Sequence, residues 1–329
     1  MLEPEIREYI YAAGKEPQLR EVVVAGTVRS GEIAGLVTGT KARKSWTLDH
    51  LGVCLDAGVP WLGNEIPEPK RTIICDAELH AQTLDNRLHK ISEAVLELGG
   101  RLGRPSSMCL RGASMTLEAL LERVGNHSKK FEAIILDPLY RLIGEYDESK
   151  PGDMRTVFNI MDKFVTQTGS VIAFSHHATK GDQSKKRATD IGSGSGVLAR
   201  SCDSWLVMRQ HRQADCMVLE RVQRSFAPVA PQVIRWRAPL WRLDSETDPT
   251  DVATPNTPLP QVEALGLRTV VEGIRAGNKS VESLRRYLGQ AEGLKKASAE
   301  RVKRYAEEAV RQGLCRLESA GGRTEFVSI

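Results

Sequence analysis

Short apolar runs alternate with segments of helical spacing between residues 22 and 244. Four of the runs have the length and composition of strands buried on both faces. They are residues 33–37, 71–76, 133–136 and 171–174. After the first run, apolar residues recur at positions 46, 48, 51, 54 and 55, a spacing typical of a helix. The alternation predicts an α/β domain over residues 22–244.

Two predicted pairs of strands close this domain. Residues 204–210 and 216–223 are β-rich and are joined by a short polar turn, which favours an antiparallel hairpin. A second pair, VIRWR and LWRL, turns at Ala238-Pro239. Ahead of the domain, residues 1–21 form an N-terminal extension with a short polar helix, to which no chemistry is assigned.

The rest of the chain predicts a linker and a second, smaller domain. Residues 245–260 contain four prolines and little apolar content, which is typical of a linker. Residues 261–329 then show three helical segments, at about 264–275, 281–288 and 298–312, followed by a hairpin. Three helices and a hairpin in this order are the layout of a small winged-helix domain, in which the third helix can enter a groove of DNA. A protein-docking module is the alternative.

The segment between the first buried strand and its helix resembles a phosphate-binding loop, GLVTGTKARKSW. In such a loop a lysine reaches the β and γ phosphates of a nucleotide and a hydroxyl ligates Mg²⁺. Lys44 and Ser45 fit these roles, although Thr38 and Arg43 stand where the pattern has glycine. A chance Lys-Ser pair in a surface turn is the alternative. The predicted nucleotide contacts are Gly39, Thr40, Lys41, Ala42, Arg43, Lys44, Ser45 and Trp46.

Two acids follow the ends of later buried strands. Glu78 comes after strand 71–76, which we expect to lie next to the phosphate-binding strand, so that its carboxylate could deprotonate the attacking water. An ordinary acid in the first turn of a helix is the alternative. Asp137 ends strand 133–136 and is placed to hold Mg²⁺ together with Ser45, whereas by itself it could be a turn or capping residue.

A histidine pair and a long basic loop follow the fourth buried strand. His176 and His177 are adjacent on an extended segment, so at most one of them faces the strand ends, where it can contact a γ-phosphate. The loop from Thr179 to Gly196 is glycine-rich and has no aromatic residue, which favours sequence-independent contact with a nucleic-acid backbone. A solvated loop is the alternative. The basic residues concerned are Lys180, Lys185, Lys186 and Arg187.

Composition and charge narrow the class of protein. A length of 329 residues predicts roughly two domains, and 41% hydrophobic and 27% charged residues are ordinary for a globular protein. A net charge of +4 allows a polyanionic partner without requiring one. Six scattered cysteines indicate buried thiols in a reducing compartment. With no signal-like start and no long apolar run, a cytoplasmic protein without a membrane span is expected.

With these motifs in register, the chain resembles the RecA-like ATPases, and among them the RepA-like hexameric helicases of plasmids, phages and mobile elements. The resemblance covers residues 22 to about 244. It is carried by ILDPLYRL (135–142), AFSHHATKG (173–181) and IGSGSGVLARSCDSWLVM (191–208). It implies a RecA-like fold, ATP and Mg²⁺ as cofactors, and a homo-oligomer, expected to be a hexamer.

The resemblance also assigns roles to individual residues. Lys44 and Ser45 would hold phosphate and Mg²⁺, and Asp137 would be the acid of the second nucleotide-binding motif. Glu78 would be the catalytic base and His176 the γ-phosphate sensor. Arg224 would be an arginine finger, because QRSFAP resembles the K-Q-R-N-G-P segment of DnaB-type helicases. Val222 stands where that segment has lysine, and an Arg at a sheet edge is otherwise a solvated charge.

The sequence therefore predicts an oligomeric ATPase that binds DNA and resembles a helicase. It would belong to a mobile-element replication or recombination system. Single-stranded DNA would bind the loop of the core, and duplex DNA the C-terminal domain through Arg301, Lys303 and Arg304. Two alternatives remain. One is a nucleotide-switched DNA-binding regulator or loader that does not unwind DNA, and the other, a small-molecule kinase, explains neither the basic loop nor the C-terminal domain.

Overall fold

A computed structural model provides the fold and describes residues 6, 14, 16–39, 42–178, 186–192, 197–253, 260–290, 298–320 and 323–328. Its strands are β1 Val22–Val24, β2 Val28–Arg29, β3 Ile33–Thr38, β4 Thr72–Asp76, β5 Ser106–Cys109, β6 Ala133–Asp137, β7 Val171–His177, β8 Ser204–Gln210, β9 Cys216–Gln223, β10 Gln232–Arg237, β11 Leu240–Asp244, β12 Cys315–Ala320 and β13 Arg323–Ser328.

The helices are α1 Lys44–Ala57, α2 Ala81–Glu97, α3 Leu117–Gly125, α4 Pro151–Thr168, α5 Val197–Ser201, α6 Pro260–Arg275, α7 Val281–Leu288 and α8 Ala299–Arg311, with short 3-10 turns at Leu139–Arg141 and Ala188–Asp190. None of the helices in the described ranges is long and apolar enough to span a membrane.

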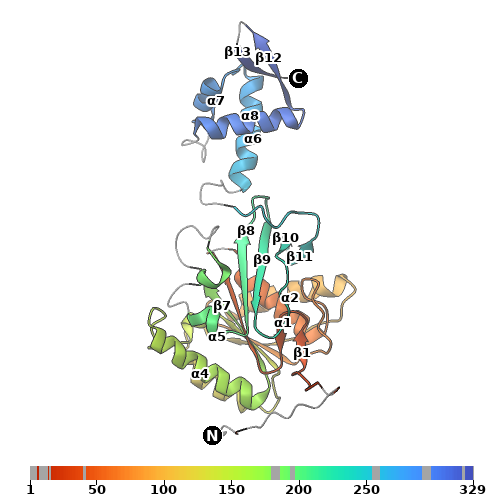
Figure 1. The fold of residues 1–329 in the computed structure, drawn as a ribbon, viewed down its shortest axis with the longest axis vertical. Helices are drawn as coiled ribbons and strands as arrows, with labels where there is room; N and C mark the ends of the chain where they lie inside the picture. Colours follow the sequence, from red (N-terminus) through yellow and green to blue (C-terminus); the bar gives the residue numbers. More distant parts are fainter. Residues whose placement is uncertain are drawn as a thin grey trace.

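One nine-stranded sheet forms the centre of the larger body, in the order β11-β10-β9-β8-β3-β7-β6-β4-β5. Strands β5, β4, β6, β7, β3 and β8 are parallel, and β9, β10 and β11 continue the sheet antiparallel. Helices α1 and α2 pack on one face, and α3, α4 and α5 pack on the other. Figure 1 shows the two groups of helices on opposite sides of the strands. This mixed, mainly parallel α/β fold confirms the predicted RecA-like core.

The sheet order corrects one expectation. Strand β4 was expected beside the phosphate-binding strand β3, but β7 and β6 lie between them. Strand β8 is not only one strand of the predicted hairpin. It pairs antiparallel with β9 and also in parallel with β3, so it belongs to the parallel part of the sheet as well. Its Trp205 ring packs against Gly35 of β3, where a Cβ atom would collide with the indole. Glycine at position 35 therefore leaves the space that the Trp205 ring of the neighbouring strand β8 occupies.

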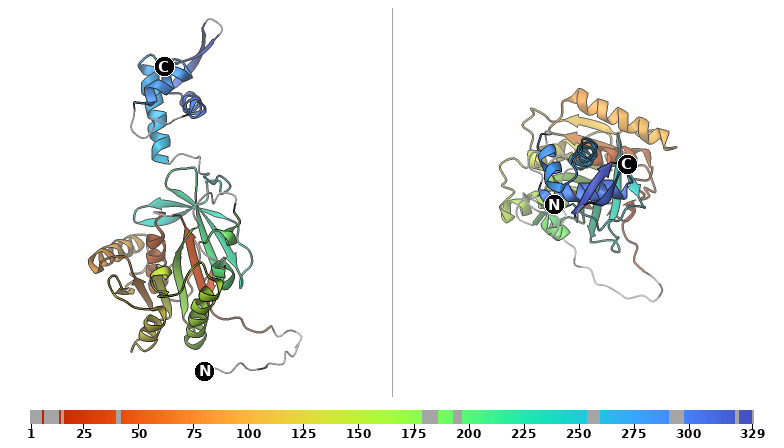
Figure 2. Two further views of the ribbon diagram at one scale, coloured as in Figure 1. Left: turned by 90° about the vertical axis from the view of Figure 1, so that its left-hand side faces the viewer. Right: turned by 90° about the horizontal axis from the view of Figure 1, so that it is seen from above.

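The C-terminal helices and hairpin have a core of their own. Leu284, Val302, Tyr305 and Ala306 are among the buried residues where α6, α7 and α8 meet. The hairpin β12–β13 pairs with a regular register from Cys315–Ser328 to Ala320–Arg323. In Figure 2 these blue elements form a body that is distinct from the larger one. The expected three helices and hairpin are present, and their comparison with a winged helix stays a prediction.

Candidate nucleotide-binding site

The parallel strands bring the predicted site residues to one edge of the sheet. Thr38, the last residue of β3, pairs with His177, the last residue of β7. Asp76 at the end of β4 pairs with Asp137 at the end of β6. Because parallel strands end at a common edge, four separate sequence segments converge there, as in other α/β proteins that bind ligands at the carboxyl ends of strands.

Helix α1 begins at this edge without a side-chain cap from its N-cap residue. Arg43, its N-cap residue, has φ of 60° and ψ of 34°, the left-handed region. Its side chain makes no capping hydrogen bond, and the first turn of α1 contains no acidic residue. The first N–H groups of a helix without a cap, together with the helix dipole, favour an anion. The start of α1 therefore fits a phosphate group.

The guanidinium of Arg43 turns away from the helix toward the hairpin β10–β11. It lies 4.8 Å from the Trp236 ring centroid, and one of its nitrogens is 3.4 Å from Asp215 Oδ1. Trp46 packs edge-to-face on the same Trp236, with ring centroids 5.7 Å apart. These contacts attach the loop to the hairpin on both sides of Lys44-Ser45. Of the other predicted loop contacts, Gly39 and Ala42 are described, whereas Thr40 and Lys41 lie outside the described residues.

Lys44 is a buried cation at the centre of the site. Its side-chain nitrogen lies 2.8 Å from Nδ1 of His177. Burial lowers the pKa of Lys44, while the nearby carboxylates of Asp137 and Glu78 act in the opposite direction. Burial also lowers the pKa of His177, and the charge of Lys44 adds to this. A neutral His177 can accept a hydrogen bond from the ammonium group at Nδ1, which explains the short contact.

The oxygens around Asp137 fit a hard divalent cation. Asp137 is 3% exposed and accepts hydrogen bonds from the hydroxyls of Ser175 and Ser45. Burial raises the pKa of its carboxyl, and the two hydroxyl groups oppose that rise. Mg²⁺ binds through one or two carboxylate or hydroxyl oxygens together with substrate phosphates and water. Ser45 and Asp137 thus lie together, as the two predicted metal-binding residues should.

Glu78 lies at the same edge on the turn that follows β4. Asp76 Oδ1 accepts from the backbone N–H groups of Glu78 and Leu79, at 2.8 and 2.6 Å, and so fixes the turn. The Glu78 side chain is 43% exposed, and its Oε1 accepts a hydrogen bond of 2.6 Å from the Tyr140 hydroxyl. Its charge acts on Lys44, so the sheet order leaves Glu78 within electrostatic reach of the phosphate-binding lysine.

The two histidines have different surroundings. His176, which the resemblance assigns as the γ-phosphate sensor, is 1% exposed and has its Nδ1 3.8 Å from Glu148 Oε1. His177 contacts Lys44, and its ring centroid is 5.5 Å from that of Tyr140. The structure therefore brings His177, and not His176, to the lysine. The alternation of strand side chains allowed only one of the pair to face the site, but it did not say which.

The described part of the long loop is anchored to strand β8. Arg209 donates to the Lys186 carbonyl over 2.7 Å, and the Trp205 indole donates to the Ala188 carbonyl over 3.2 Å. Lys186 and Arg187 are described, whereas Lys180 and Lys185 lie outside the described residues. His177, which contacts Lys44, is two residues before Thr179, where this loop begins in the sequence.

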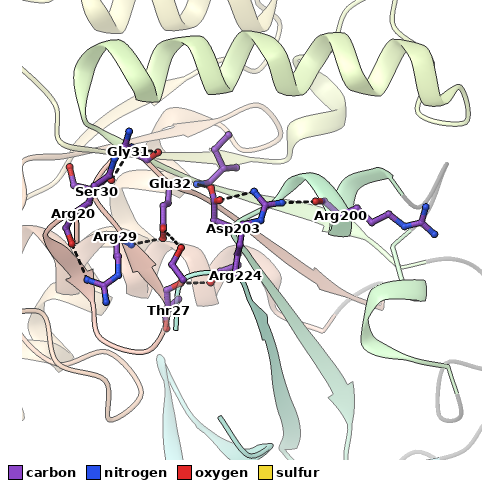
Figure 3. Close-up of polar contacts among 12 residues, drawn as sticks. Arg20, Thr27, Arg29, Ser30, Gly31, Glu32, Arg200, Asp203 and Arg224 are labelled. Atoms are coloured by element: carbon purple, nitrogen blue, oxygen red, sulfur yellow. Dashed lines mark hydrogen bonds and ion pairs between the residues drawn. The ribbon is translucent and has the colours of Figure 1, made fainter. Parts of the chain in front are cut away.

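Arg224 directly follows β9, whose last residue Gln223 pairs with Ser204 at the start of β8, so Arg224 lies at the edge of the sheet opposite the nucleotide loop. Figure 3 shows its side chain beside Asp203. Its Nη1 is 3.0 Å from Asp203 Oδ1, and its Nη2 donates to the Arg200 carbonyl over 2.8 Å. The second oxygen of Asp203 accepts from Ile33 N–H at the start of β3. Strand β3 therefore separates Arg224 from the loop of its own site by roughly 15 to 20 Å. At 58% exposure, the side chain is accessible to another molecule.

The basic residues of the C-terminal body share helix α8 with acids. Arg301, Lys303 and Arg304 are accompanied by Glu300, Glu307 and Glu308. Lys303 lies 3.8 Å from Glu307, and Arg304 stacks over the Tyr305 ring at 5.6 Å. The exposed face of α8 is therefore of mixed charge rather than uniformly basic.

Sequence reasoning missed several residues that border the site. Tyr140 was read only as part of a motif, although it contacts both Glu78 and His177. Arg87 of α2 pairs with the fully buried Asp49 at 3.0 Å and covers the Trp46 ring. For Tyr140, the available signal was its position three residues after Asp137. No cluster of three potential metal-binding His, Cys, Asp or Glu side chains occurs within the described residues.

Comparison with known proteins gives one family. Residues 9–183 match the family model AAA_25, described as AAA domain. The match takes in the loop, Glu78, Asp137 and both histidines, and it ends before strand β8. None of the curated proteins compared with the chain matches it.

Proposed function

This chain belongs to the AAA domain family and is a nucleotide-binding ATPase of the P-loop type, and we propose that it works as an oligomeric, DNA-dependent ATPase. The observation that carries the proposal is the contact between Lys44 and His177, 2.8 Å. It joins the phosphate-binding lysine to the strand end that leads directly into the basic loop. A change at the γ-phosphate then has a short route to a segment suited to DNA.

The residues at the strand ends divide the chemistry among them. The start of α1 and Lys44 would bind the phosphates, and Ser45 and Asp137 would hold Mg²⁺, which would supply positive charge at the transferring phosphoryl group. Glu78 accepts the proton of the attacking water. His177 donates to a γ-phosphate oxygen and returns to its contact with Lys44 when phosphate leaves. Each role uses a side chain that the strand ends already bring together.

Arg224 supports assembly of several subunits. It lies at the sheet edge opposite its own nucleotide loop, so it can stabilise transition-state charge only on a nucleotide held by another subunit. Where arginine fingers have been measured, they raise turnover by roughly 10³ to 10⁵. In this proposal a closed ring, with a hexamer as the expected size, places single-stranded DNA against the loops that begin after Ala178.

The finer proposal is a helicase-like motor of a plasmid, phage or mobile-element replication or recombination system, similar to the RepA-like helicases. The C-terminal body would act as a winged helix that contacts duplex DNA. The mixed charge of α8 favours contact over a limited surface rather than along a broad basic face.

A second function is favoured by the backbone of Arg43. Left-handed φ at a residue with a side chain costs about 1 to 3 kcal/mol and persists where the surroundings hold it. Here Trp236 and Asp215 hold it. A loop kept in this form could bind ATP and hydrolyse it slowly, so that the protein acts as a nucleotide-switched DNA-binding regulator or loader.

Steady-state ATP hydrolysis with and without single-stranded DNA tests the proposal, with Glu78→Gln as the comparison. We expect DNA to stimulate turnover in the wild type and Glu78→Gln to lose it while still binding ATP. Unwinding of a forked duplex then separates the motor from the regulator. ATP binding without turnover in the wild type would favour the regulator, and absence of ATP binding would refute both.

A further inference from the structure

Tyr140 connects two residues of the proposed catalytic edge. It belongs to the 3-10 turn Leu139–Arg141, which directly follows β6. Its hydroxyl donates to Glu78 Oε1 over 2.6 Å, and its ring centroid lies 5.5 Å from that of His177. Strand β6 thus supplies Asp137 at its end and, three residues later, a side chain that reaches the turn after β4.

We infer that Tyr140 is a positioning residue that orients the carboxylate of Glu78 for proton abstraction. The inference rests on the proposed function, because Glu78 acts as a catalytic base only if the protein hydrolyses ATP. Nothing in the family match assigns a role to Tyr140.

The direction of the hydrogen bond follows from the neighbours of the phenol. Arg141 Nε donates to the Tyr140 oxygen over 3.1 Å, which leaves the hydroxyl proton for Glu78. Burial raises the pKa of Tyr140, and the bond to Glu78 raises it further. The phenol therefore keeps its proton at neutral pH and acts as a donor.

The Glu78 backbone does not depend on this contact. Asp76 accepts its N–H over 2.8 Å, and Arg111 donates to its carbonyl over 2.9 Å. The carboxylate, in contrast, is at the end of a flexible side chain that is 43% exposed. The Tyr140 hydroxyl and the Arg141 guanidinium, 3.8 Å away, are the groups shown to contact it among the described residues. What Tyr140 contributes is therefore orientation of the side chain rather than of the turn.

This orientation leaves Oε2 of Glu78 for the water. In hydrolysis the water oxygen forms a bond to the γ-phosphorus, and its proton passes to Oε2. The bond from the γ-phosphorus to the bridging oxygen breaks, giving ADP and inorganic phosphate. Tyr140 keeps its proton throughout and holds Oε1. A carboxylate held in one orientation does not have to be ordered as the transition state forms.

The test is steady-state ATP hydrolysis by the full chain carrying Tyr140→Phe, which keeps the ring beside His177 and removes the hydroxyl. We expect kcat to fall by about tenfold to a hundredfold, the effect of losing one hydrogen bond to a charged group, with KM unchanged. Tyr146→Phe is the matched control. It removes a phenol bond to Glu118, 3.4 Å long and solvent-exposed, and should leave kcat at the wild-type value.

A double variant shows whether Tyr140 acts through Glu78. Adding Tyr140→Phe to Glu78→Gln should cause no further loss in single-turnover assays, because the residue being oriented is already absent. Arg141→Gln, at a side chain that is 56% exposed, should give a smaller loss of kcat without lowering the melting temperature. It serves as the second variant if Tyr140→Phe is unstable.

The outcomes separate this inference from the proposed function. If the wild type turns over ATP, Glu78→Gln does not, and Tyr140→Phe equals the wild type, the inference alone is wrong. A loss in Tyr140→Phe that adds in full to that of Glu78→Gln, or that is only in KM, also overturns it. If the wild type itself has no turnover, the proposed function fails first.

Discussion

Lys44 Nζ and His177 Nδ1 lie 2.8 Å apart and join the phosphate-binding loop to the end of the neighbouring strand β7. Both groups are partly or largely buried, and this burial lowers the pKa of each. An ammonium group that donates a hydrogen bond to a neutral imidazole can exchange this partner for a phosphate oxygen, which offers a stronger, charge-assisted hydrogen bond. We therefore expect ATP binding to change the hydrogen bond between Lys44 and His177 before it affects other parts of the chain.

Replacing the two histidines separately tests which of them has this role. His177→Ala should reduce turnover and remove its stimulation by single-stranded DNA, because the link from Lys44 to the following loop is lost. His176→Ala should instead lower the free energy of unfolding by about 1 to 3 kcal/mol, the cost of emptying a buried polar position. ATPase assays and urea unfolding of both variants check this. If only His176→Ala lost DNA stimulation, the assignment to His176 would stand.

Arg43 offers a test of backbone strain in the nucleotide loop. Both Arg43→Gly and Arg43→Ala lose the contacts with Trp236 and Asp215, but only glycine adopts φ of 60° without a steric cost. The alanine variant should therefore be less stable than the glycine variant by about 1 kcal/mol or more in urea unfolding. The same two substitutions, glycine and alanine, at Lys150 should differ less in stability, because this N-cap residue has φ of −95°.

Subunit mixing tests whether Arg224 acts on a neighbouring subunit. Arg224→Ala should lose turnover while it still binds ATP, and Lys44→Ala should bind no ATP but keep its Arg224. A mixture of the two should hydrolyse ATP faster than the sum of the separate proteins, because some interfaces combine an intact site with an intact arginine. Arg200→Ala is the control, since Arg200 offers only its backbone carbonyl to Arg224. Strictly additive rates would remove the assignment.

His50 predicts a loss of stability in acid. It is 5% exposed, and burial, with a further contribution from Arg242, lowers its pKa to about 4. The unfolded chain, with an ordinary value of about 6.5, binds the proton more readily than the folded chain between these two values. The free energy of unfolding should therefore fall as pH decreases from about 6.5 to about 4, by about 2 kcal/mol at pH 5.

The matched variant is His50→Asn, which cannot titrate. Urea unfolding at pH 7.5 and at pH 5 should show a larger decrease for the wild type than for the variant, whatever the stability of the variant at pH 7.5. Equal decreases in the two proteins would show that His50 is protonated as easily in the folded chain as in the unfolded one.

The sequence by itself determined which residue types stand at the ends of the strands. The apolar runs before Asp137 and His177, and the Lys44-Ser45 pair before a helix, are local patterns, and local spacing decides whether a segment forms a strand or a helix. For the same reason the three C-terminal helices and the hairpin were predicted near their observed bounds, for example α8 at Ala299–Arg311.

Only the tertiary structure decided which of these residues meet. Strand order is set by how helices cover both faces of a sheet, and no local pattern shows that β7 and β6 lie between β3 and β4. That order, together with the pairing of Thr38 with His177, brings His177 rather than His176 to Lys44. It also brings Tyr140 to Glu78, 62 residues away in the chain. Contacts between such distant residues depend on the packing of the whole sheet, which the spacing of neighbouring residues does not contain.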